Sequence, residues 1–413
     1  MRKLLQNLAL TLFSLLFTLA LLEGAARIFK LGTGLFWQPD SELGWVNIPN
    51  ATGWESCYGE CQIQVTINSQ GLRDREIPYE NESGATRILM LGDSTTAAMQ
   101  VALEDTFVKQ VEADLNQNEG NWEVINGGVN AYGTDNELLF YRLEGQKYDP
   151  DVVFLNVYLA NDVYNNNPTL ELRYGGQSAK PYFTLADSGD LELQNFPIED
   201  TATFWTKVGT FLKKNFQLPR FVAQTLSLRG EIPEWMQPIV RLFGGGRGAV
   251  TTDEADEAVA ADDSGGAADV EQAGEATAVP DPDRRPDICD PDPLPIVEDA
   301  WAVTEALILQ LDKEVAANDA QLAVLLIPAA PQIIPPEAGE SWYCDLPNEQ
   351  LTAFLADAGI PYLDMLPDFR EEVLAGHGPY YFERDFHMNS LGHDLTANLL
   401  YQFIDETFVT ADN

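Results

Sequence analysis

Short apolar segments alternate with amphipathic ones over much of this chain, and this order restricts its fold more than any other feature. From Arg87 to Leu159 the segments are "RILMLG", "TFVKQVEADLNQ", "WEVING", "TDNELLFYRLEGQ" and "DVVFLNVYL". Their spacing predicts strands for the first, third and fifth segments and helices for the other two. Apolar strands that alternate with helices are typical of a parallel sheet covered on both faces.

The alternation returns late in the chain. The segments "DAWAVTEALILQLDKEVAAND", "QLAVLLIPA", "NEQLTAFLADAG", "IPYLDML" and "LGHDLTANLLYQFIDETF" predict helix, strand, helix, strand and helix. Residues 86–165 and 298–413 would together form one domain around a five-stranded parallel sheet. Right-handed crossovers predict a doubly wound α/β/α sandwich of three layers, with its site at the carboxyl ends of the strands.

An insertion of different composition, residues 166–297, separates the two parts. Its first part contains "TATFWTKVGTFLKKNFQLPRFVAQTLSL", which predicts a helical cap. Residues 244–287 are rich in Gly, Ala, Asp and Glu and cannot bury enough apolar surface to offset the entropy of ordering, so we predict disorder. This acidic run could bind calcium, but it lacks EF-hand spacing, and a solvated loop is the preferred interpretation.

The N-terminal residues 1–30 contain an apolar run from Leu4 to Leu22. As a helix this run would be about 28 Å long, close to the thickness of a bilayer core. It is longer than most signal-peptide cores, and Glu23 lies where a small-residue cleavage site is expected. We predict an uncleaved signal anchor that holds an extracytoplasmic domain at the membrane. A cleaved signal peptide with secretion, or a buried soluble helix, are the alternatives.

Residues 31–85, between the anchor and the main domain, are rich in Trp, Gly, Pro and Asn. They include "CQIQVTINSQGLRD", which predicts a strand followed by a turn. We expect a small β-rich lead-in that packs on the main domain.

The chain has four cysteines, with Cys57 and Cys61 close together and Cys289 and Cys344 on either side of a predicted helix. Pairing 57 with 61 and 289 with 344 is one of three possible connectivities and would suit an oxidising compartment. A zinc site is the rival interpretation, but a second tight Cys/His pair is missing.

The formal net charge is −41, from 65 acidic and 24 basic residues. Such a charge repels nucleic-acid phosphates, so we do not expect nucleic acid as a partner. The sequence contains neither a Walker loop nor an HExxH motif. We therefore expect no cofactor and no metal.

Ser94, in "LGDSTTAAMQV", lies where the first strand should turn into a helix. A serine there is a common helix cap, and it is also well placed for a nucleophile, because its own N–H can face an oxyanion. The next two strands end in "INGGVNAYGT" and "NVYLANDV" at the same sheet edge. The Gly128 N–H and the Asn161 amide would join the Ser94 N–H as oxyanion donors. Turn-forming glycines and a capping Asn are the structural alternative.

A general base must come from three histidines, His377, His387 and His393. "ERDFHMNSLGH" precedes the last helix and should also lie at the carboxyl edge of the sheet. Asp385, two positions before His387, could orient its imidazole and stabilise the imidazolium that forms when a serine loses its proton. We expect His393 to pack or to cap the helix.

Four blocks, "LGDST", "NGGVNAYGT", "LANDV" and "DFHMNSLGH", resemble in order and spacing those of the SGNH (GDSL) hydrolase family. The resemblance covers residues 86–165 and 298–405. It implies a flavodoxin-like fold and a serine esterase that works through an acyl-enzyme. It implies that Ser94 is the nucleophile, His387 the base and Asp385 the acid that orients the base. The implied oxyanion donors are Ser94, Gly128 and Asn161.

The sequence departs from the family pattern at two places. Leu159 stands where the third block usually has Gly, and only Phe386 separates Asp385 from His387, where two residues are usual. Asp364, at the end of the fifth predicted strand, is an alternative acid.

The anchor and the "DxHxN" ending are similar to those of membrane-anchored bacterial relatives, which include cell-envelope carbohydrate O-acetyl transferases and esterases. Hydrolysis of a carboxylic ester, with a cell-envelope glycan or lipid as the substrate, is the preferred hypothesis. A polysaccharide O-acyltransferase and a catalytically inactive glycan-binding protein are the alternatives.

Overall fold

A five-stranded parallel sheet forms the centre of the molecule. A computed structural model describes residues 2–29, 31, 34–117, 120–173, 180–199, 204–227, 287–335 and 343–409. The strands of the central sheet, in spatial order, are β11 (Tyr362–Asp364), β10 (Gln321–Ile327), β7 (Val152–Tyr158), β5 (Thr86–Leu91) and β6 (Trp122–Asn126). All neighbouring pairs in this sheet are parallel.

Numbered along the chain, these strands lie in the order 2-1-3-4-5, which is the flavodoxin-like, doubly wound arrangement. The predicted fold class is therefore confirmed. The chain reverses its direction of winding between β5 and β7, since β6 lies on one side of β5 and all later strands lie on the other. Ligands of such folds bind at this reversal, outside the carboxyl ends of the strands.

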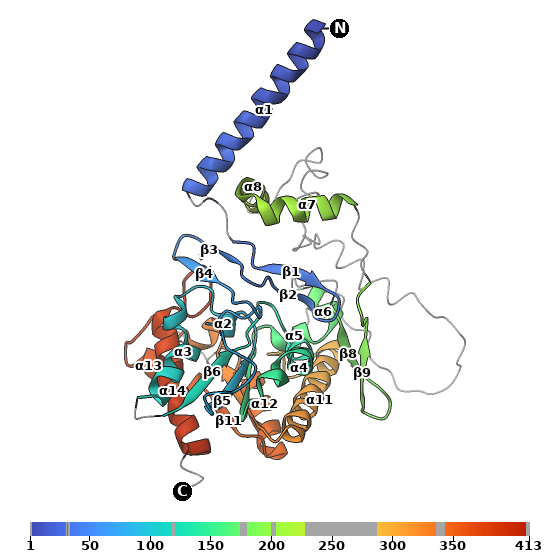
Figure 1. The fold of residues 1–413 in the computed structure, drawn as a ribbon. Helices are drawn as coiled ribbons and strands as arrows, with labels where there is room; N and C mark the ends of the chain where they lie inside the picture. The colour runs from blue at the N-terminus through green and yellow to red at the C-terminus, as the bar shows by residue number, and fades with distance from the viewer. Residues whose placement is uncertain are drawn as a thin grey trace, which may run out of the picture.

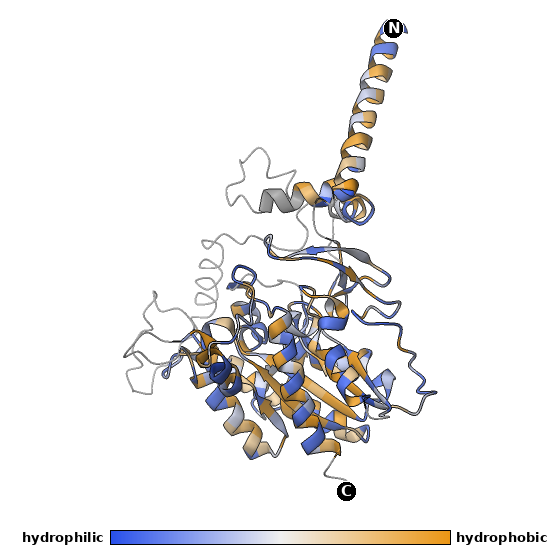
Figure 2. Cartoon of the chain, turned by 90° about the vertical axis from the view of Figure 1, so that its left-hand side faces the viewer, coloured by the Kyte–Doolittle hydropathy of each residue, from blue (hydrophilic) through white to orange (hydrophobic). Residues whose placement is uncertain are grey.

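Helices cover both faces of the sheet and give the three layers in Figure 1. One face packs against α4 (Thr134–Leu143), α11 (Pro295–Ala317) and α12 (Leu346–Ala358). The other packs against α3 (Phe107–Leu115), α13 (Leu366–Leu374) and α14 (Ser390–Ile404). Side chains of β5 alternate between the two cores, with Leu89 and Leu91 in the first and Ile88 and Met90 in the second. Figure 2 shows the resulting apolar strands inside the body.

The two parts of the domain join although a long insertion separates them in sequence. β10 pairs along its whole length with β7, for example Leu322 with Val153. Of the insertion, the structure describes α6 (Pro168–Arg173), β8 (Tyr182–Leu185), β9 (Leu191–Gln194), α7 (Phe204–Asn215) and α8 (Gln217–Ser227). The segment predicted to be disordered lies outside the described residues except for Asp287.

The lead-in forms two small antiparallel sheets. Their strands are β1 (Trp37–Asp40) with β2 (Gly44–Asn47), and β3 (Thr52–Ser56) with β4 (Gln62–Thr66). Phe36, Val65 and Ile67 share a core with Met99, and the Trp45 Nε1–H donates to the Asn130 carbonyl at 2.8 Å. These contacts attach the lead-in to the loops at the carboxyl ends of β5 and β6.

Of the three possible connectivities, the structure has the disulfides Cys57–Cys61 and Cys289–Cys344. The first closes a short loop between β3 and β4. The second joins the segment before α11 to the segment before α12.

The N-terminal helix α1 (Arg2–Ile28) extends away from the body (Figure 1). By its length and composition, α1 is a helix that could cross a membrane. The large apolar side chains from Leu4 to Leu22 are all exposed.

Candidate active site

Ser94 is the first residue of a one-turn helix, α2 (Ser94–Ala97), which follows β5 directly. The helix cap is Asp93, whose buried carboxylate accepts hydrogen bonds from the Thr95 N–H at 2.8 Å and the Thr95 hydroxyl at 2.7 Å. Asp93 therefore takes the capping role that the sequence had left open for Ser94. The Ser94 hydroxyl lies beside this cap, half-buried and available to a base.

The turn around Ser94 is held by buried groups. Arg73, from the lead-in, is 1% exposed and donates to the carbonyls of Ala97 at 2.6 Å, of Val101 at 2.5 Å and of Ala98. Burial lowers the pKa of Arg73 to about 10, so the guanidinium stays charged at neutral pH. A one-turn helix leaves carbonyls at its C-terminal end without internal partners, and Arg73 binds the last carbonyl of α2 and two carbonyls that follow it.

Ser94, His387 and Asp385 form one hydrogen-bonded chain. The Ser94 Oγ lies 2.9 Å from the His387 Nε2, and the His387 Nδ1 lies 2.6 Å from the Asp385 Oδ1. Ser94 comes from the end of β5, while the other two residues come from the loop before α14. These are the three residues that the sequence proposed for nucleophile, base and orienting acid, and the structure brings them together.

The pKa of His387 is raised above its ordinary value. Burial by itself lowers the pKa, but the hydrogen bond and the charge of Asp385, with a smaller contribution from the Asp93 charge, outweigh it. The side chain of Asp385 is 11% exposed, so water screens its charge only weakly. The pair therefore favours the imidazolium, the form of His387 that would follow proton transfer from a serine.

Phe386, between Asp385 and His387, adopts a left-handed conformation with φ of 62°. Such a conformation is uncommon for a bulky residue and persists only where the surrounding structure imposes it. The Phe386 side chain is 58% exposed, so its own packing does not impose the conformation. The left-handed residue turns the backbone so that the flanking side chains meet, which accommodates the one-residue spacing noted above.

Glu60, in the loop closed by the Cys57–Cys61 disulfide, holds the backbone next to Asp385. Its carboxylate accepts three consecutive N–H groups, from Glu383 at 2.9 Å, Arg384 at 2.9 Å and Asp385 at 3.2 Å. Charge-assisted bonds of this kind are stronger than neutral ones. Nothing in "CYGEC" indicated this contact, because its partner lies 323 residues away.

The residues proposed as oxyanion donors differ in their surroundings. Asn161 follows β7, and its Nδ2 donates to the Asp93 Oδ2 at 3.2 Å. The Asn161 amide therefore contacts the residue that precedes Ser94. The Gly128 N–H already donates to the Asn126 Oδ1 at 3.0 Å. A Cβ on Gly128 would lie 2.4 Å from the Ala97 nitrogen, so close packing on α2 requires this glycine. The structure thus gives Gly128 a packing role and leaves its N–H occupied.

The remaining candidates do not contact Ser94. His393 is buried in α14, where burial lowers its pKa to about 3 and keeps the ring neutral. His377 lies 2.5 Å from Glu372 at the surface. Asp364 accepts from Asn348 at 2.8 Å and from the first N–H of α13. His377 and Asp364 therefore each have a hydrogen-bond partner nearby in the chain, and His393 is an uncharged core residue.

Buried carboxyl groups surround Asp93, and the sequence analysis did not find them. Glu137 is 1% exposed, and both of its carboxyl oxygens lack a hydrogen-bond partner among the described residues. Burial, followed by the charges of Asp93 and Asp135, raises the pKa of Glu137 well above its ordinary range. Asp162 is affected in the same direction by burial and by Asp93 and Glu137. Lys180 neutralises Asp135 at 2.8 Å, so Glu137 is the group left without a partner.

Within the described residues, no three or more His, Cys, Asp or Glu side chains are arranged to hold a metal ion.

Comparisons with known proteins find similarity only among solved structures. No family model and no curated protein matches the chain. It is similar to a putative acylhydrolase from Bacteroides fragilis, at 12% identity and a TM-score of 0.34, over 80% of this chain and 92% of that one. It is also similar to a psychrotrophic esterase from Pseudoalteromonas sp., at 14% identity and a TM-score of 0.34, over 79% and 100% of the two chains. An acetyl xylan esterase has 11% identity and a TM-score of 0.36, over 76% and 98%.

Replacing Glu60 with Ala should lower the pKa of His387. Without the carboxylate, the 383–385 backbone loses its acceptor and Asp385 is no longer held against the imidazole, which removes the cause that raises the pKa. Titration of the His387 ring by NMR measures this shift. Glu60→Gln keeps one acceptor oxygen and should give an intermediate shift. An unchanged His387 titration in the Ala variant would show that Glu60 does not position Asp385.

Replacing Glu137 with Gln should stabilise the protein at neutral and alkaline pH. In the folded state the carboxyl keeps its proton to a higher pH than in the unfolded chain, so ionisation favours unfolding progressively as pH rises above the ordinary pKa. The neutral amide removes this cost, which we expect to be about 1 to 3 kcal/mol, comparable to an unsatisfied buried group. Denaturant unfolding in detergent as a function of pH measures the difference.

The gain for Glu137→Gln should disappear well below the pKa of an ordinary glutamate, where both the folded and the unfolded state are protonated. Glu349 is exposed on α12, and Glu349→Gln is the matched control, for which no pH-dependent gain is expected. A stability difference that does not change with pH would argue against a retained proton on Glu137.

Proposed function

We propose that this chain is a serine ester hydrolase of the SGNH type. The observation that carries the proposal is the continuous contact from the Ser94 Oγ through His387 to Asp385, at 2.9 Å and 2.6 Å. A serine within hydrogen-bond reach of an imidazole, which is itself held by a carboxylate, is the arrangement that activates a hydroxyl for attack on a carbonyl. Its position at the winding reversal of the sheet is where such folds bind ligands.

The first chemical step follows from these contacts. The Ser94 Oγ attacks the ester carbonyl carbon while its proton passes to the His387 Nε2. The Asp385 carboxylate stabilises the imidazolium, and His387 then gives the proton to the departing alcohol. This leaves the acyl group on Ser94 as an ester. In the second step His387 takes a proton from water while the water oxygen attacks the acyl carbonyl. His387 then returns this proton to the Ser94 Oγ as the bond between Oγ and the acyl carbon breaks, which releases the free acid and restores the serine.

The oxyanion would be held by the Ser94 N–H and by the Asn161 amide. An Asn side chain has two N–H donors, and only one is needed for the 3.2 Å contact with Asp93. The other is available to a negatively charged oxygen, and such donors contribute strongly to acyl transfer. In the loop after β6, Ala131 has φ of 62°, and within the described residues its N–H has no acceptor. We therefore propose Ala131, in place of Gly128, as the donor from that loop.

We further propose that the enzyme acts outside the cytoplasm and is held at a membrane by α1. Two disulfides fit an oxidising compartment. The end of α1 is hydrogen-bonded to the rest of the chain, since the Glu23 carboxylate accepts from the Gln217 and Leu218 N–H groups at 2.9 Å and 2.8 Å. A helix that forms part of the folded structure in this way fits a retained anchor better than a removed signal peptide.

Ser94→Ala should reduce hydrolysis of a short-chain aryl ester by about a thousandfold or more, because the nucleophile is lost. It should also abolish labelling by a fluorophosphonate probe, which reacts with activated serines. Ser188, an exposed serine bonded to Asp190, provides the control variant Ser188→Ala, which should keep full activity. If Ser94→Ala still turns over the ester, the proposed nucleophile is wrong.

The rate constant kcat/KM should rise with pH through the pKa of His387, since only the neutral imidazole can accept a proton from Ser94. Because the Asp385 pair raises this pKa, the midpoint should lie above the ordinary value of 6.5. Asp385→Asn removes the main cause of the raised pKa. We expect a midpoint at lower pH and a kcat lowered by about a thousandfold. A pH profile with the same midpoint in both proteins would exclude His387 and Asp385 as the base and its partner.

A further inference from the structure

The helices α7 and α8 have a charge opposite to that of the rest of the chain. Residues 204–227 contain four basic side chains and no acidic one, in a protein whose net charge is −41. The basic residues are Lys207, Lys213, Lys214 and Arg220. A positively charged segment in so acidic a chain is suited to an anionic partner.

Hydrogen bonds tie these helices to the end of α1. The Glu23 carboxylate accepts from the first N–H groups of α8, and the Arg27 Nη2 donates to the Asn215 carbonyl at 3.0 Å. These contacts lie directly after Leu22, where the apolar run of α1 ends. In Figure 1, α7 and α8 lie beside this end of α1, on the side of the α/β body from which α1 extends. If α1 crosses a bilayer, α7 and α8 must therefore lie at the surface of that bilayer.

The outward face of α7 combines aromatic and basic side chains. Phe204 is 70% exposed and Phe211 is 61% exposed, and their seven-residue spacing puts them on the same face of the helix. Lys207 and Lys214 are exposed at positions three residues after each Phe. Helices that lie in a membrane interface have this pattern, because the rings enter the acyl boundary and the lysines reach the lipid phosphates.

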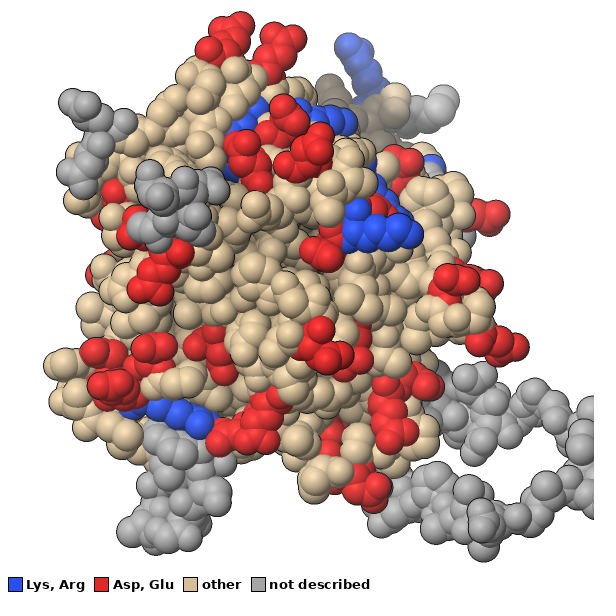
Figure 3. All heavy atoms as spheres, turned by 90° about the horizontal axis from the view of Figure 1, so that it is seen from below, with Lys and Arg blue, Asp and Glu red and all other residues tan. Residues whose placement is uncertain are grey.

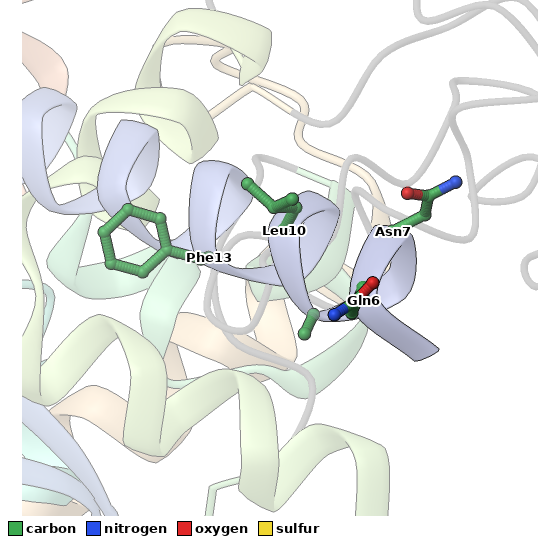
Figure 4. Close-up of a pocket in the computed structure, with 5 residues that line it drawn as sticks. Gln6, Asn7, Leu10 and Phe13 are labelled. Carbon is green, nitrogen blue, oxygen red and sulfur yellow. The ribbon is translucent and has the colours of Figure 1, made fainter. Parts of the chain in front are cut away.

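The distribution of apolar and acidic side chains on the neighbouring surfaces is the one that a bilayer around α1 would require. Figure 4 shows Leu10 and Phe13 projecting from α1, in a shallow hollow that Gln6, Asn7 and Ala9 also line. Figure 3 shows that the opposite end of the molecule, seen from below, carries many Asp and Glu side chains. The apolar and basic surfaces thus lie on one side of the body, and an acidic surface lies on the other.

We propose that α7 and α8 form a second membrane contact, which lies in the head-group layer beside α1 and binds anionic lipids. Phe204 and Phe211 insert at the acyl boundary, while Lys207 and Lys214 bind lipid phosphates. This contact rests on the proposed anchoring by α1 and is independent of ester hydrolysis. It would restrict tilting of the body on its anchor, since a single helix leaves the body free to rotate, whereas two contacts do not.

The depth of α7 can be measured in the full chain after reconstitution into phosphatidylcholine vesicles that contain phosphatidylglycerol. A fluorophore on Phe211→Cys should be quenched by nitroxide-bearing lipids and protected from iodide in the aqueous phase. The matched control is Leu374→Cys on α13 of the body, where the leucine is 66% exposed. Its label should be quenched by iodide and not by the lipids. Intact mass confirms that a single label is attached and both disulfides remain.

Equal iodide quenching of the two labels, in protein that floats with the vesicles, would overturn the contact by α7 while leaving the anchor intact. Protein that does not float would overturn both. Activity toward an aryl ester is a separate measurement, so loss of the proposed hydrolase function would not affect either result.

The lipid charge provides a second test. Removing phosphatidylglycerol should reduce the lipid quenching of the Phe211→Cys label. For each lysine that binds a phosphate, we expect the equilibrium between membrane-bound and free α7 to change by about fivefold. In a Lys207→Glu, Lys214→Glu double variant of the labelled chain, phosphatidylglycerol should no longer increase the quenching. Near-UV circular dichroism checks that the variant is folded. A parent label that does not respond to phosphatidylglycerol would exclude the anionic-lipid site.

Discussion

The site depends on one sharp turn, between β5 and the one-turn helix α2, which buried polar side chains hold in place. Asp93 caps the start of the helix, and Arg73 satisfies carbonyls at its end. The Asn126 Nδ2 donates to the Thr96 carbonyl at 2.9 Å from the end of β6. So short a helix has few hydrogen bonds of its own and is unstable in isolation. The position of Ser94 is therefore determined by residues from several separate segments of the chain.

The lead-in holds both ends of the hydrogen-bonded series Ser94–His387–Asp385 in place. Arg73 holds the turn that carries Ser94, and Glu60 holds the loop that carries Asp385. These two residues belong to the same small β-rich segment, which also connects α1 to the body. A change in the position of this segment would therefore act on the proposed nucleophile and on the proposed acid together. The Cys57–Cys61 disulfide shortens the loop around Glu60 and limits the positions that its carboxylate can take.

Charged side chains differ between the buried region around Asp93 and the outer surface. Around Asp93, acidic groups are buried close to one another, and Glu137 has no hydrogen-bond partner among the described residues, so a proton is the simplest way to neutralise it. On the outer surface, the face of the body opposite α1 carries many Asp and Glu side chains, while α7 and α8 contain only basic charged residues.

The sequence by itself determined the α/β alternation and the fold class, and it singled out Ser94, His387 and Asp385, which hydrogen bonds join in the structure. Periodicity reports which face of each element is buried, and the carboxyl ends of parallel strands meet at one edge whatever the loops contain. Only the tertiary structure decided among the three disulfide connectivities, gave the cap to Asp93 and occupied the Gly128 N–H with Asn126. It also brought Glu60 to Asp385 and α8 to α1. Some of these contacts join residues that are far apart in the chain, and in others two groups could have made the same hydrogen bond. Tertiary packing determines which contact forms in both cases, and local sequence spacing does not.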